Sequence, residues 1–262
     1  MASDKFLSFR PREFKGSRLR CLLLSHRPRR CVAEFLTALS GGNAQVSVED
    51  KWAPDGFLSP NEAKLGVTPG FLPKTQRTEI TKWWLKNPGR ANTPNWDLVS
   101  TANVGGRPGL LVVEAKSHEG EFSSDRCGAT NQANFQQIKK ALEQANDAWN
   151  QHVPGFALSA ESYYQLSNRF AFAWKLAELN VPVVLVYLGC LNAEEMSGRR
   201  ILSSHDAWRN CVVSRAGKTI PEAVWDRRFE FNGTPVTVMI RSADVRVEAT
   251  VCETNRKTPS DS

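Results

Sequence analysis

The sequence predicts an α/β fold in which a central mixed β-sheet is flanked by helices. Three observations support this prediction: two adjacent strand-like segments within residues 95–116, two long helical stripes at 131–149 and 163–177, and a run at 183–188 that is apolar at every position. A strand that is apolar at consecutive positions is typical of a sheet buried on both faces. Helices before and after such a strand therefore indicate a layered α/β architecture.

The N-terminal segment is basic. Residues 1–30 are rich in Arg and Lys, contain scattered prolines and have no sustained hydrophobic period, so we expect a flexible arm. From Cys31 to Leu39, four apolar side chains fall on one helical face, and the Gly pair that follows can end this helix in the left-handed conformation. We therefore expect a single folded domain over residues 31–252 and a polar tail at 253–262.

A helix and two strands are expected next. Thr75 or Thr78 can cap a helix that ends before the Pro-Gly pair near residue 88. Two strands follow, at residues 95–101 and 110–116. The short, Gly-rich connection between them predicts an antiparallel hairpin.

Two helices and a buried strand complete the expected core. Asn131 is a strong N-cap residue, and the apolar positions in 135–149 recur at steps of three and four. The second stripe, at 163–177, leads through a proline into the apolar strand. The core is therefore expected to span residues 75–191. A C-terminal β-hairpin within 224–248, built on an Asn-Gly turn, is predicted as an extension of this core.

Composition limits the class of protein. The net charge of +7 favours a polyanionic partner, although much of the charge lies in the N-terminal segment. The longest apolar run is far shorter than the ~20 residues of a spanning helix, so no membrane segment is expected. The six cysteines lie far apart and lack zinc-ligand spacing, which indicates reduced thiols and a cytoplasmic protein. An organellar transit peptide is the alternative for the Arg-rich start.

One group of residues carries the chemistry. Asp97 begins one predicted strand, and Glu114-Ala115-Lys116 ends the next. Side chains alternate along a strand, so Glu114 and Lys116 project from one face and Ala115 from the other. Burying an uncompensated carboxylate is costly, and a divalent cation relieves that cost. Hard ions bind carboxylate and carbonyl oxygens, so Asp97 and Glu114, with the Ala115 carbonyl, form a candidate Mg²⁺ site.

Lys116 has a separate role in this interpretation. Its spacing from Glu114 keeps the ammonium beside the proposed ion, where it can position the attacking water and offset charge that develops on a phosphate. In-line displacement at phosphorus depends mainly on positioning and electrostatics. Two carboxylates and one lysine are therefore sufficient in kind for hydrolysis of a phosphodiester bond.

Asp97 and the Glu114-Ala115-Lys116 triplet, in a helix, strand, strand, helix, strand order over roughly residues 75–191, resemble the PD-(D/E)xK nuclease superfamily. The resemblance implies a restriction-endonuclease-like sheet, Mg²⁺ dependence with Mn²⁺ as a substitute, Asp97 and Glu114 as metal ligands and Lys116 as the catalytic lysine. The sequence departs from the family pattern in one respect, because Pro94 stands three positions before the Asp instead of directly before it.

Further site residues are suggested by the same resemblance. Glu79, on the helix before the first strand, matches an additional acid of many relatives, or it is a solvated helix charge. Gln132 and Gln136, one turn apart and off the apolar stripe, match a polar contact to water or phosphate, or they are plain surface. Arg169 is a candidate on other grounds, because it lies among aromatic residues on the next predicted helix. It can clamp a phosphate bidentately, or it can pair with Glu161 or another acid.

The predicted function is a Mg²⁺-dependent nuclease. DNA is the expected substrate, although nothing in the sequence separates DNA from RNA, and a homodimer is an option because many such enzymes cut both strands as dimers. The alternative is a non-catalytic nucleic-acid-binding protein with the same fold. A third hypothesis is a structural or partner-binding domain. No glycine-rich phosphate loop, Ser/His/Asp set or dinucleotide fingerprint competes with these interpretations.

Overall fold

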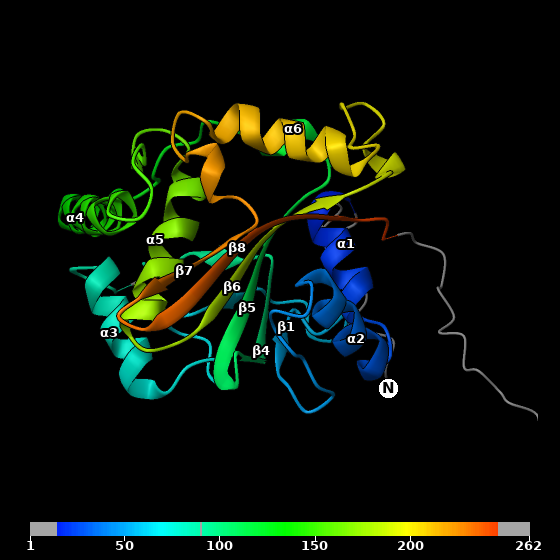
Figure 1. Ribbon diagram of the computed structural model, residues 1–262, viewed down its shortest axis with the longest axis horizontal. Coiled ribbons are helices and arrows are strands. Elements are labelled where there is room, and N and C mark those ends of the chain that lie inside the picture. The colour runs from blue at the N-terminus through cyan, green and yellow to red at the C-terminus, as the bar shows by residue number, and fades with distance from the viewer. Residues whose placement is uncertain (1–14, 90, 246–262) are drawn as a thin grey trace, which may run out of the picture.

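The computed structural model describes residues 15–89 and 91–245 of the chain, and its centre is a six-stranded mixed sheet (Figure 1). The predicted fold class, a mixed sheet flanked by helices, is confirmed at this level. In the order in which they lie side by side, the strands are β1 (Trp52–Ala53), β4 (Leu98–Val104), β5 (Arg107–Lys116), β6 (Val183–Cys190), β8 (Thr234–Ala243) and β7 (Arg227–Phe231). A separate two-stranded sheet joins β2 (Ala63–Lys64) to β3 (Asn95–Trp96).

Strand directions follow the lengths of the connections. The predicted hairpin is present, because β4 and β5 pair antiparallel across a turn at Gly105 and Gly106, both of which have positive φ. The parallel pairs β5–β6 and β6–β8 are separated by long helical connections. The three parallel strands β5, β6 and β8 therefore bring their carboxyl ends to the same edge of the sheet.

Helices cover both faces of the sheet (Figure 1). On one face lie α1 (Gly16–Ser25) and α2 (Arg29–Leu39), and on the other lie α3 (Lys74–Trp84), α4 (Gln132–Asn150), α5 (Tyr164–Glu178) and α6 (His205–Ala216). Short 3-10 turns occur at Glu119–Glu121, Glu194–Met196 and Glu222–Val224.

Strand β5 shows how the two cores are filled. Leu110 and Val112 join the core on the side of α3 to α6, whereas Val113 and Ala115 join the core on the side of α1 and α2. This alternation sends the next side chain of the first series, that of Glu114, toward α5.

The prediction of a flexible arm at residues 1–30 is wrong for the part of this range that the structure describes. Helix α1 lies inside this range, and its Leu22 and Leu24 are buried. Arg20 is buried as well, because its guanidinium binds the carboxylate of Glu195 and the carbonyl of Val245. The basic character of this segment therefore did not make Arg20 an exposed residue. Residues 1–14 and the predicted tail at 253–262 lie outside the described ranges.

The C-terminal hairpin is present, but it is not an extension outside the core. Strands β7 and β8 pair around the predicted Asn-Gly turn, and β8 also pairs in parallel with β6. The core is therefore larger than residues 75–191. The reason is visible in β8, where Val238 contributes to the core on one face of the sheet and Met239 to the core on the other.

Two properties bear on the setting of the protein. The cysteines at positions 21, 127, 190 and 211 are free thiols, whereas Cys31 is in a disulfide, so the prediction of six reduced thiols is wrong for Cys31. Over the two described ranges, no helix combines the length and the apolar character needed to cross a bilayer.

Candidate active site

The three residues of the predicted motif meet at the carboxyl end of β5. The Nζ of Lys116 donates to Oε1 of Glu114 at 2.5 Å, and the carboxylate of Asp97 accepts a hydrogen bond from the backbone N–H of Ala115 at 2.8 Å. Glu114 is only 1% exposed and Lys116 only 6%. The structure therefore places an acid, a second acid and an amine around one buried point.

Asp97 reaches this point because the chain leaves the sheet beside it. The register of the hairpin sets Leu98 opposite Val113, so a continued ladder would set Trp96 opposite Ala115. Instead, β3 turns away to pair with β2. The N–H of Ala115 would lose its partner at this break, and the side chain of Asp97 supplies the acceptor.

Both carboxylate oxygens of Glu114 are engaged. Oε1 accepts from Lys116, and Oε2 accepts from Nε of Arg169 at 2.6 Å. Burial raises the pKa of Glu114, but the positive charges of Arg169 and Lys116 outweigh it, so the net pKa lies below the ordinary value. Glu114 is therefore ionised at neutral pH although it is almost completely buried.

Arg169 is an internal residue that holds Glu114. Its guanidinium also donates to Oδ1 of Asn168 at 2.7 Å and to the carbonyl of Asn95 at 2.6 Å, and it lies over the ring of Trp96, 4.4 Å from the ring centre. Of the two sequence interpretations, the ion pair is the one found, with Glu114 as the acid instead of Glu161. The structure does not present Arg169 as an exposed phosphate clamp.

The surroundings of Asp97 disfavour its ionised form. Burial, followed by the negative charge of Glu114, raises the pKa of Asp97 to about 7, against the lowering effects of Lys116, Arg169 and the Ala115 N–H. Burial lowers the pKa of Lys116, but the negative charges of Glu114 and Asp97 raise it by more, so the net pKa lies above the ordinary value. Lys116 is therefore an ammonium at neutral pH and acts as a charge, not as a base.

Sequence reasoning missed Gln165. Its Oε1 accepts a second hydrogen bond from Lys116, at 2.9 Å, so Lys116 is held between Glu114 and Gln165. Gln165 and Arg169 stand one turn apart on α5, a helix that is otherwise almost entirely buried. That spacing on an apolar helix was the available signal, because polar side chains one turn apart face the same way.

The structure does not bring the other three predicted residues to this point. Gln132 and Gln136 are exposed on α4, and Glu79 is exposed on α3. In the described part of the chain, none of the hydrogen bonds or ion pairs links them to the motif. The first turns of α4 instead serve packing, since Asn134 binds the backbone of Asn87 on the α3 side.

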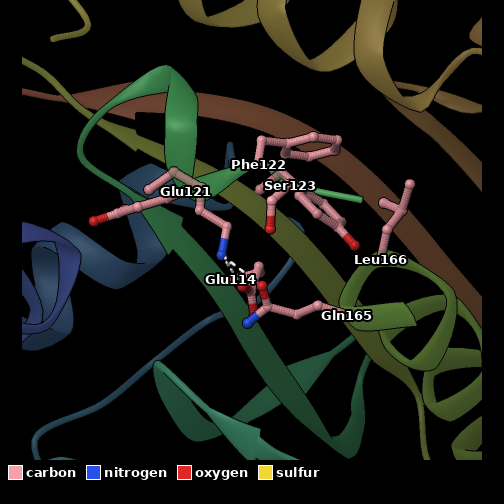
Figure 2. Close-up of a pocket in the computed structure, with 8 residues that line it drawn as sticks. Glu114, Glu121, Phe122, Ser123, Gln165 and Leu166 are labelled. Carbon is pink, nitrogen blue, oxygen red and sulfur yellow. Dashed lines mark hydrogen bonds and ion pairs between the residues drawn. The ribbon is translucent and has the colours of Figure 1, made fainter. Parts of the chain in front are cut away.

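The site is closed. A small pocket beside Glu114 offers about 10 Å³ to the centre of a water-sized sphere, which is room for one water or one ion. Figure 2 shows the lining side chains, which are Glu114, Lys116, Glu121, Phe122, Ser123, Gln165, Leu166 and Tyr187. Among the residues described, no group of three or more His, Cys, Asp or Glu side chains is placed to hold a metal ion.

Comparisons of the chain with protein-family models, with curated proteins and with solved structures gave no match.

Proposed function

We propose that this protein is a Mg²⁺-dependent nuclease, in which Asp97 and Glu114 bind the ion and Lys116 positions the attacking water. The observation that supports this proposal is the presence of a second carboxylate, that of Asp97, beside Glu114. A structural ion pair needs only Glu114 and its cations, and an amide at position 97 would accept the Ala115 N–H without placing another negative charge beside Glu114. A titratable carboxyl group kept where a neutral amide would serve is a mark of a functional site.

The donor set fits a hard divalent ion in kind. Asp97 and Glu114 offer carboxylate oxygens, and the Ala115 carbonyl is the third predicted ligand. In the present arrangement the ammonium of Lys116 occupies the cation position against Oε1 of Glu114. Because Gln165 already accepts a second hydrogen bond from Lys116, the ammonium keeps a partner when it moves off Glu114. Such an ion would supply a Lewis acid for the phosphate and for water.

The roles of the chain's own residues follow from their contacts. Arg169 fixes Glu114 through Nε and is itself held over Trp96. Lys116 brings a positive charge that offsets the negative charge developing on a phosphodiester during attack. The net charge of +7 favours a nucleic acid as the source of that phosphate, and we propose DNA.

The alternative, a nucleic-acid-binding protein without activity, is favoured by a different observation. Both oxygens of Glu114 are already satisfied by cations, and the pocket beside it admits only one small group. In that case the buried network specifies the fold, and its members affect stability but not chemistry.

The deciding experiment is a cleavage assay with a variant that leaves the fold intact. Asp97→Asn keeps an acceptor for the Ala115 N–H and removes the charge, so it is a better test than the truncation of buried Lys116. Plasmid, linear and single-stranded DNA are incubated with Mg²⁺ or Mn²⁺, beside Glu143→Gln, which removes one exposed charge from α4. Cleavage by wild type and by Glu143→Gln, but not by Asp97→Asn, supports the nuclease. Wild-type protein that cuts none of these substrates would leave the binding alternative.

A further inference from the structure

The turn that follows β5 covers the candidate site. Residues 117–123, here called the lid turn, contain the 3-10 helix Glu119–Glu121 and run between the end of β5 and the loop that leads to α4. Figure 2 shows Glu121, Phe122 and Ser123 of the lid turn among the side chains that line the pocket beside Glu114. Because the lid turn lines this small pocket, access of a nucleotide to Glu114 and Lys116 from this side requires the lid turn to move.

The inner side of the lid turn is held by packing. Phe122 is buried, and its ring lies 6.2 Å from that of Trp208 on α6 and 6.4 Å from that of Tyr187 on β6. The carboxylate of Glu121 accepts hydrogen bonds from the N–H and the hydroxyl of Ser117 at 2.7 and 2.9 Å. The lid turn is therefore held by hydrogen bonds between its own residues and by the packing of Phe122 in the core.

The outer side of the lid turn is held by two arginines. The carboxylate of Glu119 lies 3.4 Å from Nη1 of Arg200 and 3.5 Å from Nη2 of Arg215. Arg215 also donates to the carbonyl of Phe122 at 3.2 Å, and the N–H of Glu119 donates to the carbonyl of Arg200 at 3.0 Å. Arg200, in the loop before α6, and Arg215, on α6, are both distant in sequence from the lid turn, and both contact the carboxylate of Glu119.

The exposure of these groups decides how firmly the turn is held. The side chain of Arg200 is 80% exposed and that of Arg215 is 39% exposed, so solvent and salt reach both ion pairs. Exposed pairs of this kind stabilise a structure only weakly. A competing anion therefore displaces Glu119 far more easily than it would break the buried pair of Glu114 and Arg169.

A phosphodiester is the anion that matches this arrangement. Its two unesterified oxygens carry one negative charge, as the two oxygens of Glu119 do, and guanidinium groups bind both kinds of anion through paired N–H donors. The arginines contact the lid turn through Glu119 and the carbonyl of Phe122, while Glu121, Phe122 and Ser123 of the same turn line the pocket beside Glu114. A phosphate bound to the arginines would therefore act on the turn that covers the site.

We propose that the lid turn is an autoinhibitory cover in which Glu119 takes the place of a nucleic-acid phosphate, so that a backbone phosphate binding to Arg200 and Arg215 releases the turn and opens the site. This inference rests on the proposed function, since it names how the substrate of that site is bound and admitted.

Two measurements on the full chain test the proposal. Hydrogen exchange of peptides covering residues 117–123 reports opening of the turn, and fluorescence anisotropy of a labelled single-stranded oligonucleotide reports binding. Both are done in EDTA at low salt, so cleavage is not required. The variants are Glu119→Gln and the double variant Arg200→Gln with Arg215→Gln. Glu143→Gln is the control of equal charge change for Glu119→Gln.

Glu119→Gln and the double arginine variant are expected to have the same effect on hydrogen exchange and opposite effects on oligonucleotide binding. Both should speed exchange in the lid turn by about three- to tenfold, since both break the same exposed pairs. Glu119→Gln should bind the oligonucleotide about three- to tenfold more tightly, because the arginines are released for phosphate. The double arginine variant should bind at least about tenfold more weakly and with a smaller salt dependence, by about two counterions. Oligonucleotide added to wild type should speed exchange in the lid turn.

Other outcomes overturn the proposal. These are an oligonucleotide that leaves exchange in the lid turn unchanged or slows it, a Glu119→Gln protein that binds no better than Glu143→Gln, arginine variants that bind as wild type does, or wild type that does not bind at all. A failure of the nuclease proposal is distinguishable, because it would appear as binding and opening as expected without cleavage when Mg²⁺ is supplied.

Discussion

The carboxylate of Asp97 binds the backbone N–H of Ala115, the residue that stands between Glu114 and Lys116. This hydrogen bond ties the end of one strand to the charged end of the next, and so it holds Asp97 close enough to Glu114 for the two charges to interact. It also makes Asp97 informative in experiments, since an amide at this position preserves the bond and removes only the charge.

The stability of the protein should depend on pH through Asp97. Its pKa is about 7 in the folded chain, against an ordinary value of 3.8, so between these pH values the folded state binds the extra proton. The free energy of unfolding contributed by Asp97 therefore falls as pH rises through this window and is constant outside it. Relative to wild type, Asp97→Asn should gain stability with rising pH, by at most ~1.4 kcal/mol per pH unit.

Urea unfolding of both proteins at several pH values between 4 and 8 measures this difference. A difference that stays flat across the window, or that changes in favour of wild type, would show that the Asp97 carboxylate is not held in its neutral form.

Binding of Mg²⁺ should be detectable without any substrate. An ion that binds only the folded chain raises its stability by about 2.7 kcal/mol at a concentration one hundred times its Kd. We expect Mg²⁺ to raise the Tm of wild type by several degrees at pH 8, where Asp97 is ionised, and to have little effect on Asp97→Asn. Calorimetric melts with and without EDTA check this, with Ca²⁺ as a second hard ion. Equal shifts in the two proteins would place the ion elsewhere.

Removal of Arg169 should strongly destabilise the fold. Arg169→Ala leaves Glu114 buried with only one cation, and breaking a buried pair typically costs about 3–5 kcal/mol. Arg228→Ala is the matched control, because its pair with Glu230 is exposed on both sides and should contribute less than about 1 kcal/mol. Denaturant titrations give both values, and similar losses for the two variants would mean that Glu114 is solvated.

Gln165 should affect the rate of cleavage more than the affinity for DNA. Gln165→Leu removes the acceptor that holds Lys116 opposite Glu114 and keeps a side chain of similar size. If the nuclease proposal holds, kcat should fall by about tenfold or more while KM changes little, since only the position of the ammonium is lost. Steady-state assays, with Tm as a check on folding, measure this. A Gln165→Leu protein with wild-type kcat would remove Gln165 from the site.

The hairpin and its charged end could be predicted from sequence because they depend on short-range geometry. A short turn between two strand-like segments makes them antiparallel, and alternation puts Glu114 and Lys116 on one face with Ala115 on the other. Helices α4 and α5 were predictable for the same reason, since the period of an apolar stripe is a property of one segment.

Residues supplied by distant elements could not be assigned in this way. Gln132 and Gln136 were proposed on α4, but α5 is the helix whose side chains reach the end of β5. It contributes Gln165, which the sequence analysis did not name, and Arg169, whose partner it did not identify. Which helix face meets the charged end of a strand is decided by how whole layers pack, and no local pattern encodes that. The burial of α1 was missed for a related reason, because the partner of Arg20 is Glu195, far along the chain.

The sequence by itself thus determined the class of fold and the pairing of Glu114 with Lys116, since backbone periodicity fixes both. Only the tertiary structure decided that Arg169 binds Glu114 inside the protein, that Asp97 completes a broken ladder, and that the lid turn lines the pocket beside Glu114. These features depend on contacts between segments that are distant in the chain, and the packing of the layers alone brings those segments together.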